Sequence, residues 1–184
     1  MSVRQALLAL LGEQPRYGYQ LRQEFERRTG ATWPLNIGQV YTTLARLVRD
    51  GLAEEKDRQA DGSVIYALTD AGREEVARWW AGPVERPAAG RDELAIKLAL
   101  AVTVPGVDVR AVVQHQRVES LRALQEYTHR KRQAPPDDEP AALAADLVLD
   151  ALIFAVESEA RWLDHVEQTL LHRDRTDPHR KAAR

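Results

Sequence analysis

The most informative segment of the sequence is Asn36-Ile-Gly-Gln-Val-Tyr-Thr-Thr-Leu-Ala-Arg-Leu-Val-Arg-Asp-Gly51. Its apolar residues recur at steps of three and four, which places them on one side of a helix. Gly51 supplies the left-handed residue that commonly ends a helix. The other side carries Gln, Thr and Arg, side chains that read base edges and phosphates, so the stretch predicts a DNA recognition helix. The apolar positions are Ile37, Val40, Tyr41, Leu44, Leu47 and Val48, and the polar ones are Gln39, Thr42, Thr43, Arg46 and Arg49.

The segments around this helix predict a winged helix-turn-helix. Two stretches of helical spacing precede it, and two short apolar strands follow it, joined by the turn residues Asp61-Gly62-Ser63. Helix, helix, helix and hairpin is the order of a winged helix-turn-helix. The predicted elements are helices at 2–12 and 17–29, strands at 52–58 and 64–68, and a further helix from Thr69 or Asp70.

Several short motifs occur in a fixed order between Leu7 and Trp80. They are Tyr17-Gly-Tyr-Gln-Leu21, Gly38-Gln-Val-Tyr-Thr-Thr-Leu44, Leu47, Gly51-Leu52, Tyr66-Ala-Leu-Thr69 and Gly72. Together they resemble the PadR family of bacterial transcriptional regulators. The resemblance implies an N-terminal winged helix and a C-terminal helical dimerisation region. The segment Ala60-Asp61-Gly62-Ser63-Val64 lacks the basic residues that the family often has near the wing tip, which weakens the expected wing contact with DNA.

The candidate DNA contacts follow from the chemistry of each side chain. Arg46 is suited to fork onto a guanine and Gln39 to read an adenine. The two threonines are expected to touch a phosphate or a thymine methyl, and Tyr41 to pack its ring while its hydroxyl reaches the DNA backbone. The first turn of the second helix offers N–H groups to another phosphate. The predicted DNA-binding residues are Tyr17, Gln39, Tyr41, Thr42, Thr43, Arg46, Lys56 and Arg58.

These residues also fit structural roles. Arg46 and Arg49 are compatible with an ordinary solvated face, and Tyr17 and Tyr19 fit core positions better than DNA contacts. The net charge is −2, and residues 1–82 hold eleven basic and eleven acidic side chains. Binding to DNA therefore requires charge segregation, with Arg46, Arg49, Lys56 and Arg58 on one face.

The C-terminal half predicts a dimer. Pro/Gly-rich connectors at about 82–90 and 134–140 separate helices expected at 91–102, 107–132 and 141–173, before a polar tail at 173–184. The last helix has an apolar surface too broad for one partner helix, which favours packing across a two-fold axis. The predicted dimerisation residues are Leu149, Leu152, Phe154, Val156, Leu163, Val166 and Leu170.

Composition excludes several other classes of protein. At 184 residues, with 44% apolar and 29% charged residues, the chain is an ordinary globular protein. The absence of cysteine excludes disulfides and thiolate chemistry. The apolar run at 6–11 is too short to span a membrane, so we expect a cytoplasmic protein. The five histidines form no metal pair, and no phosphate loop or nucleophile motif occurs, so we predict neither an enzyme nor a bound metal or cofactor.

Tryptophan suggests a ligand. Some relatives within the family that the chain resembles bind aromatic or cationic drugs at a tryptophan-lined dimer interface, and others respond to phenolic acids. Trp162 and Trp80 are the candidate effector-binding residues here. The alternative is that all four tryptophans only pack, because large rings bury much area.

The sequence as a whole predicts a mainly α fold with a small β-hairpin wing, divided into a DNA-binding domain at 1–82 and a helical dimerisation region at 83–184. The expected function is that of a homodimeric repressor that binds a palindromic promoter operator on double-stranded DNA and is released by a small aromatic or hydrophobic effector. The alternative is a dimeric winged-helix module that binds another protein. The two differ in salt dependence, since phosphate contacts make DNA affinity fall steeply with salt.

Overall fold

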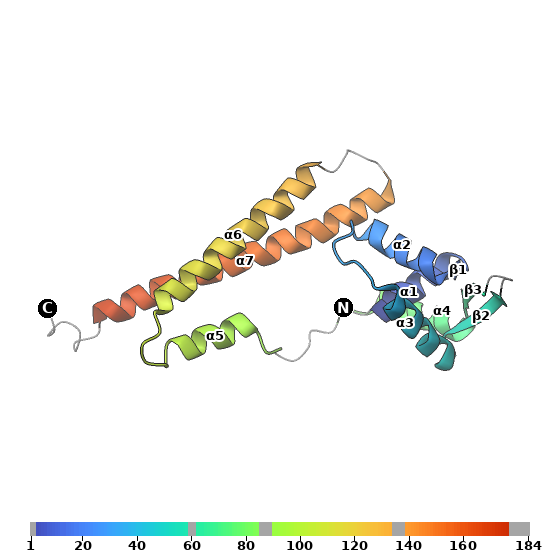
Figure 1. The fold of residues 1–184 in the computed structure, drawn as a ribbon, viewed down its shortest axis with the longest axis horizontal. Coiled ribbons are helices and arrows are strands. Elements are labelled where there is room, and N and C mark those ends of the chain that lie inside the picture. The colour runs from blue at the N-terminus through green and yellow to red at the C-terminus, as the bar shows by residue number, and fades with distance from the viewer. Residues whose placement is uncertain (1–2, 59–61, 85–89, 134–138, 177–184) are drawn as a thin grey trace. The chain divides into compact units, whose positions relative to one another are not determined.

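The computed structural model of the chain describes residues 3–58, 62–84, 90–133 and 139–176. Its elements confirm the predicted fold class, mainly helical with a small antiparallel sheet (Figure 1). In chain order they are α1 (Val3–Glu13), β1 (Arg16–Tyr17), α2 (Gly18–Arg28), α3 (Ile37–Arg49), β2 (Ala53–Arg58), β3 (Val64–Leu68), α4 (Asp70–Ala81), α5 (Glu93–Ala101), α6 (Val109–Gln133) and α7 (Pro140–Thr176).

The described residues fall into two compact units. The first, which we call the winged unit, lies within Met1–Arg86 and Asp137–Val148. The second, which we call the helical unit, lies within Pro87–Pro136 and Leu149–Arg184. The predicted interdomain connectors, the wing-tip residues 59–61 and most of the polar tail lie largely outside the described residues.

Helix α3 confirms the helix predicted from the opening stretch. The side chain of Asn36 accepts a hydrogen bond from the Gly38 N–H at 2.8 Å and so caps the first turn. Three apolar residues at helical spacing, Val40, Leu44 and Leu47, are fully buried. The helix ends before Gly51, whose φ of +72° is the left-handed conformation that the sequence predicted there.

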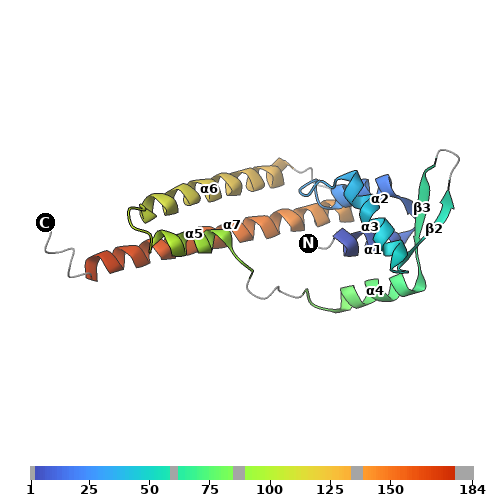
Figure 2. The same cartoon turned by 60° about the horizontal axis from the view of Figure 1, so that its bottom comes forward.

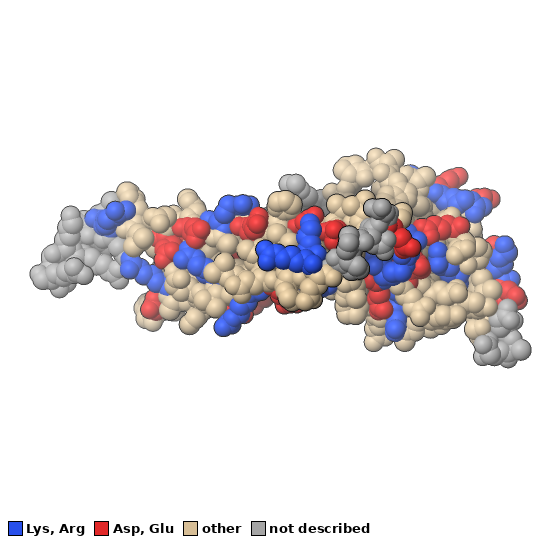
Figure 3. Space-filling view, turned by 90° about the horizontal axis from the view of Figure 1, so that it is seen from above, with Lys and Arg blue, Asp and Glu red and all other residues tan. Residues whose placement is uncertain are grey.

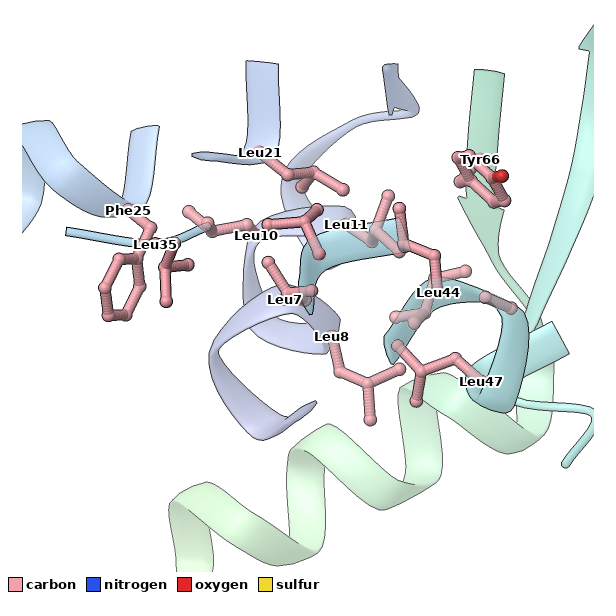
Figure 4. Packing of buried hydrophobic residues seen from close by; sticks show 13 residues of the cluster. Leu7, Leu8, Leu10, Leu11, Leu21, Phe25, Leu35, Leu44, Leu47 and Tyr66 are labelled. Carbon is pink, nitrogen blue, oxygen red and sulfur yellow. The ribbon is translucent and has the colours of Figure 1, made fainter. Parts of the chain in front are cut away.

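The core of the winged unit is built around α1. Leu7 and Leu8 have no exposed surface, and they share one cluster with Leu21 of α2 and with leucines of α3 (Figure 4). Strand β3 completes the cluster with Tyr66 and Leu68, which are two residues apart and so lie on the same side of the sheet. The labelled side chains in Figure 4 are Leu7, Leu8, Leu10, Leu11, Leu21, Phe25, Leu35, Leu44, Leu47 and Tyr66. Burial of this face explains why α3 holds a fixed orientation on the domain.

The sheet has three strands in the order β1-β3-β2, one more than the predicted hairpin. The added strand pairs Arg16 with Tyr66 and Tyr17 with Ile65. Tyr17 therefore lies in β1, and α2 begins one residue later than predicted. A strand of two residues has no periodicity, which is why the sequence did not reveal it.

The start of α4 is locked onto the end of α3. The Thr69 hydroxyl donates to the Gly51 carbonyl at 2.7 Å and accepts from the Gly72 N–H at 3.1 Å. It therefore caps α4 and satisfies a carbonyl left free where α3 ends. Figure 2 shows α3, α4 and the β2–β3 hairpin meeting in this region.

An ion cluster joins the end of α1 to α2. The Glu13 carboxylate accepts hydrogen bonds from the Arg28 guanidinium at 2.5 and 2.7 Å and from Arg16 at 3.0 Å. The bonds from Arg28, and more weakly those from Arg16, hold the pKa of Glu13 below its ordinary value despite some desolvation. Contacts of this kind stabilise the charged carboxylate in the folded state.

Replacing Glu13 by glutamine is expected to make the winged unit less stable at pH 7, and by a smaller amount at pH 3. A carboxylate with a depressed pKa contributes its stabilisation above the unfolded pKa of about 4.3 and loses it as the pH falls through the lower folded value. Urea unfolding at both pH values measures the difference from the wild-type chain. Glu74→Gln, an exposed residue of α4, is the control. A deficit for Glu13→Gln that is the same at both pH values would contradict the prediction.

In the helical unit, α6 packs antiparallel against α7. A small apolar cluster of Leu98, Val113 and Leu163 joins these two helices to α5. A polar seam fixes the register of the two long helices. In the middle of this seam, the buried Ser120 hydroxyl donates to Glu159 at 2.6 Å and Gln116 donates to the same oxygen at 2.9 Å. Among the described residues, no helix is long and apolar enough to cross a membrane.

Candidate nucleic-acid interface

The outward face of α3 carries the predicted base-reading side chains. At 3.6 residues per turn, Thr42 lies opposite the buried stripe of Val40, Leu44 and Leu47. Gln39 and Arg46 flank Thr42 on one side and are exposed. The structure therefore brings Gln39, Thr42 and Arg46 together on one accessible surface.

Arg46 and Arg49 differ in what their guanidinium groups bind. Arg49 forks onto the carboxylate of its neighbour Asp50, with Nε and Nη2 at 3.1 and 3.0 Å from the same oxygen. The Arg46 side chain has no hydrogen bond or ion pair within the part of the chain that the structure describes. Arg46 therefore keeps all its donors available for a ligand, whereas Arg49 is partly neutralised.

Both threonines of α3 use their hydroxyl protons inside the helix. Thr42 donates to the Gly38 carbonyl and Thr43 to the Gln39 carbonyl, each at 2.8 Å. Bonds of this kind to the carbonyl four residues earlier fix the side-chain rotamer. In this conformation neither hydroxyl can donate to a phosphate. Of the two contacts predicted for these threonines, a phosphate or a thymine methyl group, the second therefore fits the structure better.

The tyrosines at the start of α2 lie close to α3. The ring of Tyr41 packs on the backbone of Gly18, where an added Cβ would lie 2.6 Å from the ring carbon Cε1, and the residue stays 44% exposed. Tyr17 and Tyr19 stack with ring centroids 5.7 Å apart. Tyr19 is 48% exposed, so the core position expected for it was wrong. The sequence signal for this contact was Gly18 between Tyr17 and Tyr19, because a residue without a side chain lets the ring of Tyr41 approach the backbone.

The backbone N–H of Tyr17 is not free for a phosphate. It donates to the Gln20 side chain at 3.0 Å, which begins α2. The tyrosine side chain is partly buried. This first N–H group of the α2 turn is therefore already satisfied within the chain.

The wing carries mixed charge. Lys56 is exposed at a β-bulge between Glu55 and Asp57, where β2 shifts register against β3. Arg58 pairs with Val64 through the backbone. Its side chain, and Asp61 at the wing tip, lie outside the described residues. Lysines and arginines alternate with acidic residues over the surface seen in Figure 3, without a broad region of one sign.

The two candidate effector residues belong to different units. Trp80 in α4 is 68% exposed and tilts against Trp79 with ring centroids 4.4 Å apart. Trp162 in α7 is 36% exposed. No group of three or more His, Asp or Glu suited to a metal ion occurs among the described residues.

The predicted dimerisation residues separate into inner and outer positions. Leu163 is fully buried within the chain itself, and Leu149 nearly so. Val166 and Leu170 pack against the same cluster as Leu163. Phe154, by contrast, is 65% exposed, and Leu152 and Val156 are half-buried. Thus Leu163 has no surface left for a second copy, while Phe154 has much.

Two family matches together span most of the chain. Residues 7–78 match the PadR-like family of transcriptional regulators, and residues 90–170 match the C-terminal region of virulence activator alpha. The probable transcriptional regulator Rv1176c of Mycobacterium tuberculosis is 31% identical over an alignment of length 185. The match covers 92% of this chain and 98% of that protein.

Solved structures share the fold. The Vibrio cholerae virulence activator AphA has a TM-score of 0.69 at 22% identity, covering 93% of this chain and 99% of its own. Bacillus subtilis PadR in complex with operator DNA has a TM-score of 0.65 at 20% identity, covering 90% and 97%. The same protein in complex with p-coumaric acid has a TM-score of 0.68 at 21% identity, covering 89% and 95%.

The family matches to both halves of the chain and a relative that matches almost from end to end all indicate transcriptional regulators. The chain therefore belongs to the PadR-like family of transcriptional regulators and is not an enzyme.

Proposed function

We propose that the protein is a homodimeric repressor whose α3 helices read the two halves of a near-palindromic promoter operator. The observation that carries this proposal is the outward face of α3, where Arg46 has no partner among the described residues and Gln39 lies on the same side of the helix two turns earlier. Arginine bidentate to guanine and glutamine bidentate to adenine are the pairings that the major groove favours. Bacillus subtilis PadR, which has the same fold, forms a complex with operator DNA, and this supports operator DNA as the ligand proposed here.

Dimerisation supplies the affinity that one short helix lacks. Two recognition helices of a two-fold dimer reach successive major grooves about 34–36 Å apart. The region 83–184 is the proposed dimerisation part, because α7 leaves large apolar side chains exposed in a single chain. Leu143, Leu147 and Phe154 are each at least 60% exposed.

Release by a small aromatic or hydrophobic molecule completes the proposed cycle. The p-coumaric acid complex of Bacillus subtilis PadR supports a ligand of this class, and Trp162 and Trp80 are the aromatic candidates to bind it. A ligand releases the operator only if it binds the DNA-free dimer more tightly than the bound one. p-Coumaric acid is the probe we would add first to an operator complex.

A dimeric protein-interaction module is the second candidate. The exposed residues at 54–57 favour it, since three of the four (Glu54, Glu55 and Asp57) are acidic and would repel DNA. The free guanidinium of Arg46 and the neighbouring Gln39 favour DNA.

Fluorescence anisotropy with a labelled duplex from the DNA upstream of the gene tests the choice. A repressor is expected to discriminate against a scrambled duplex of equal composition. It should also lose affinity steeply as salt rises, by about a thousandfold between 50 and 200 mM if it contacts six or more phosphates. Equal, weak binding to both duplexes would exclude a sequence-reading repressor and favour the interaction module.

Replacing Gly18 by alanine is expected to weaken operator binding without unfolding the domain. The new Cβ would displace the ring of Tyr41, which is half exposed and can swing into solvent. A lost hydrogen bond from the Tyr41 hydroxyl to DNA costs about 0.5–1.5 kcal/mol in each half-site. Circular dichroism checks the fold, and anisotropy the affinity.

Tyr41→Phe is the companion variant for this prediction. It removes the hydroxyl alone, so combining it with Gly18→Ala should add little to either change. Additive losses in the double variant would show that Gly18 acts through something other than Tyr41.

A further inference from the structure

The centre of the α3 outward face is made of small residues from Gly38 to Ala45, before Arg49 continues the same row. Gly38, Thr42 and Ala45 lie along it, one helical turn apart, and all three are exposed. The larger side chains, Gln39 and Arg46 on one flank and Tyr41 on the other, stand beside this ridge. A ridge of small residues lets the helix backbone approach the floor of a groove closely, so Thr42 becomes the side chain at the point of closest approach.

The chemistry that Thr42 can offer there is restricted. Its hydroxyl proton is given to the Gly38 carbonyl at 2.8 Å, so the oxygen can accept a hydrogen bond but not donate one. Guanine, with two acceptors in the major groove, gains nothing from such a group, and the amino groups of adenine and cytosine could bond only to its oxygen. Thymine offers a C5-methyl group, which an apolar side-chain methyl can contact.

We propose that Thr42 is a specificity-determining residue that selects thymine, through contact of its γ-methyl group with the thymine C5-methyl, at one position in each operator half-site. This inference rests on the proposed function and adds to it the base that is selected, thymine, and the group that is contacted, its C5-methyl. The bond to Gly38 acts by positioning, because it holds χ1 and so directs the methyl group. Cytosine, which lacks the C5-methyl, is the pyrimidine that this contact rejects.

Deoxyuridine provides the sharpest test, since it differs from thymidine only by the missing methyl. Each thymine of the bound upstream duplex is replaced in turn, and anisotropy gives Kd for the wild-type chain, Thr42→Ser and Thr42→Val. At one thymine per half-site the wild-type chain should lose about fourfold in affinity, the value of one buried methyl group. Thr42→Ser should lose as much on the natural duplex and nothing more on the substituted one. Thr42→Val, which keeps a methyl and removes the hydroxyl, should retain the preference for thymine.

Thr43→Ser is the matched control, because Thr43 makes the same 2.8 Å bond at the edge of the face. It should keep the full penalty for deoxyuridine at that position. The inference is overturned if deoxyuridine weakens Thr42→Ser as much as the wild-type chain, if no thymine is sensitive, or if Thr42→Val loses the preference. The proposed function fails separately, and this inference with it, if the wild-type chain binds natural and scrambled duplexes equally.

Discussion

Replacing Gly72 by alanine is expected to destabilise the winged unit by about 3 kcal/mol or more, at the upper end of the cost of overpacking a core. A Cβ at this position would lie 2.1 Å from the Leu52 carbonyl oxygen and 2.7 Å from a methyl carbon of Leu68. The first of these is backbone, held between α3 and the sheet, so the clash cannot be relieved by a rotamer change. The whole start of α4 would have to move away from the strands, and the capping bonds of Thr69 would be lost with it.

Gly12→Ala is the matched control for this experiment. Its Cβ would face the same residue, Leu68, but at 3.7 Å, an ordinary van der Waals contact. Gly12 lies within α1, where alanine is favoured over glycine by roughly 0.5–1 kcal/mol. Urea unfolding should therefore show opposite signs for the two variants. Similar small effects from both would mean that α4 does not hold its observed contact with the sheet.

Arg46→Ala is expected to abolish sequence-specific operator binding at working concentrations. A bidentate contact with guanine contributes about 1–3 kcal/mol of discrimination, and a dimer makes it twice. The combined loss is at least about thirtyfold in Kd, with every 1.4 kcal/mol counting as a factor of ten. Because Arg46 is exposed, the fold should be unchanged. Anisotropy on the upstream duplex and on a scrambled duplex measures both affinity and discrimination.

Arg49→Ala separates base reading from simple charge loss. It removes the same group from the same helix, but one already bound to Asp50. We expect a smaller effect that is equal on both duplexes, since only a screened charge is lost. If the two variants lose affinity equally and keep their discrimination, Arg46 contributes charge alone and the assignment of base contacts on α3 fails.

The sequence determined the winged unit to a large extent. The three- and four-residue spacing of Val40, Leu44 and Leu47 predicted both α3 and its buried side. Gly51 predicted where the helix ends. Such features are local, because the period of a helix and the conformational freedom of glycine depend on neighbouring residues only.

The tertiary structure decided features that depend on distant partners. Strand β1 exists because β3, some fifty residues later, offers a free edge to Arg16 and Tyr17. The exposure of Tyr19 and the seat of the Tyr41 ring on Gly18 depend on how α2 meets α3. The sequence alone suggests that the Thr42 hydroxyl is free to bind DNA, and only the structure shows that it donates to the Gly38 carbonyl.

The long C-terminal helix shows the limit most clearly. Periodicity identified its apolar residues but assigned Leu163 and Phe154 alike to a dimer seam. In the structure Leu163 is covered by α5 and α6, while Phe154 remains exposed. A sequence pattern determines which side chains avoid water, because hydrophobicity belongs to the residue itself. Which surface covers each of them is decided only when the elements pack, because burial belongs to the pair.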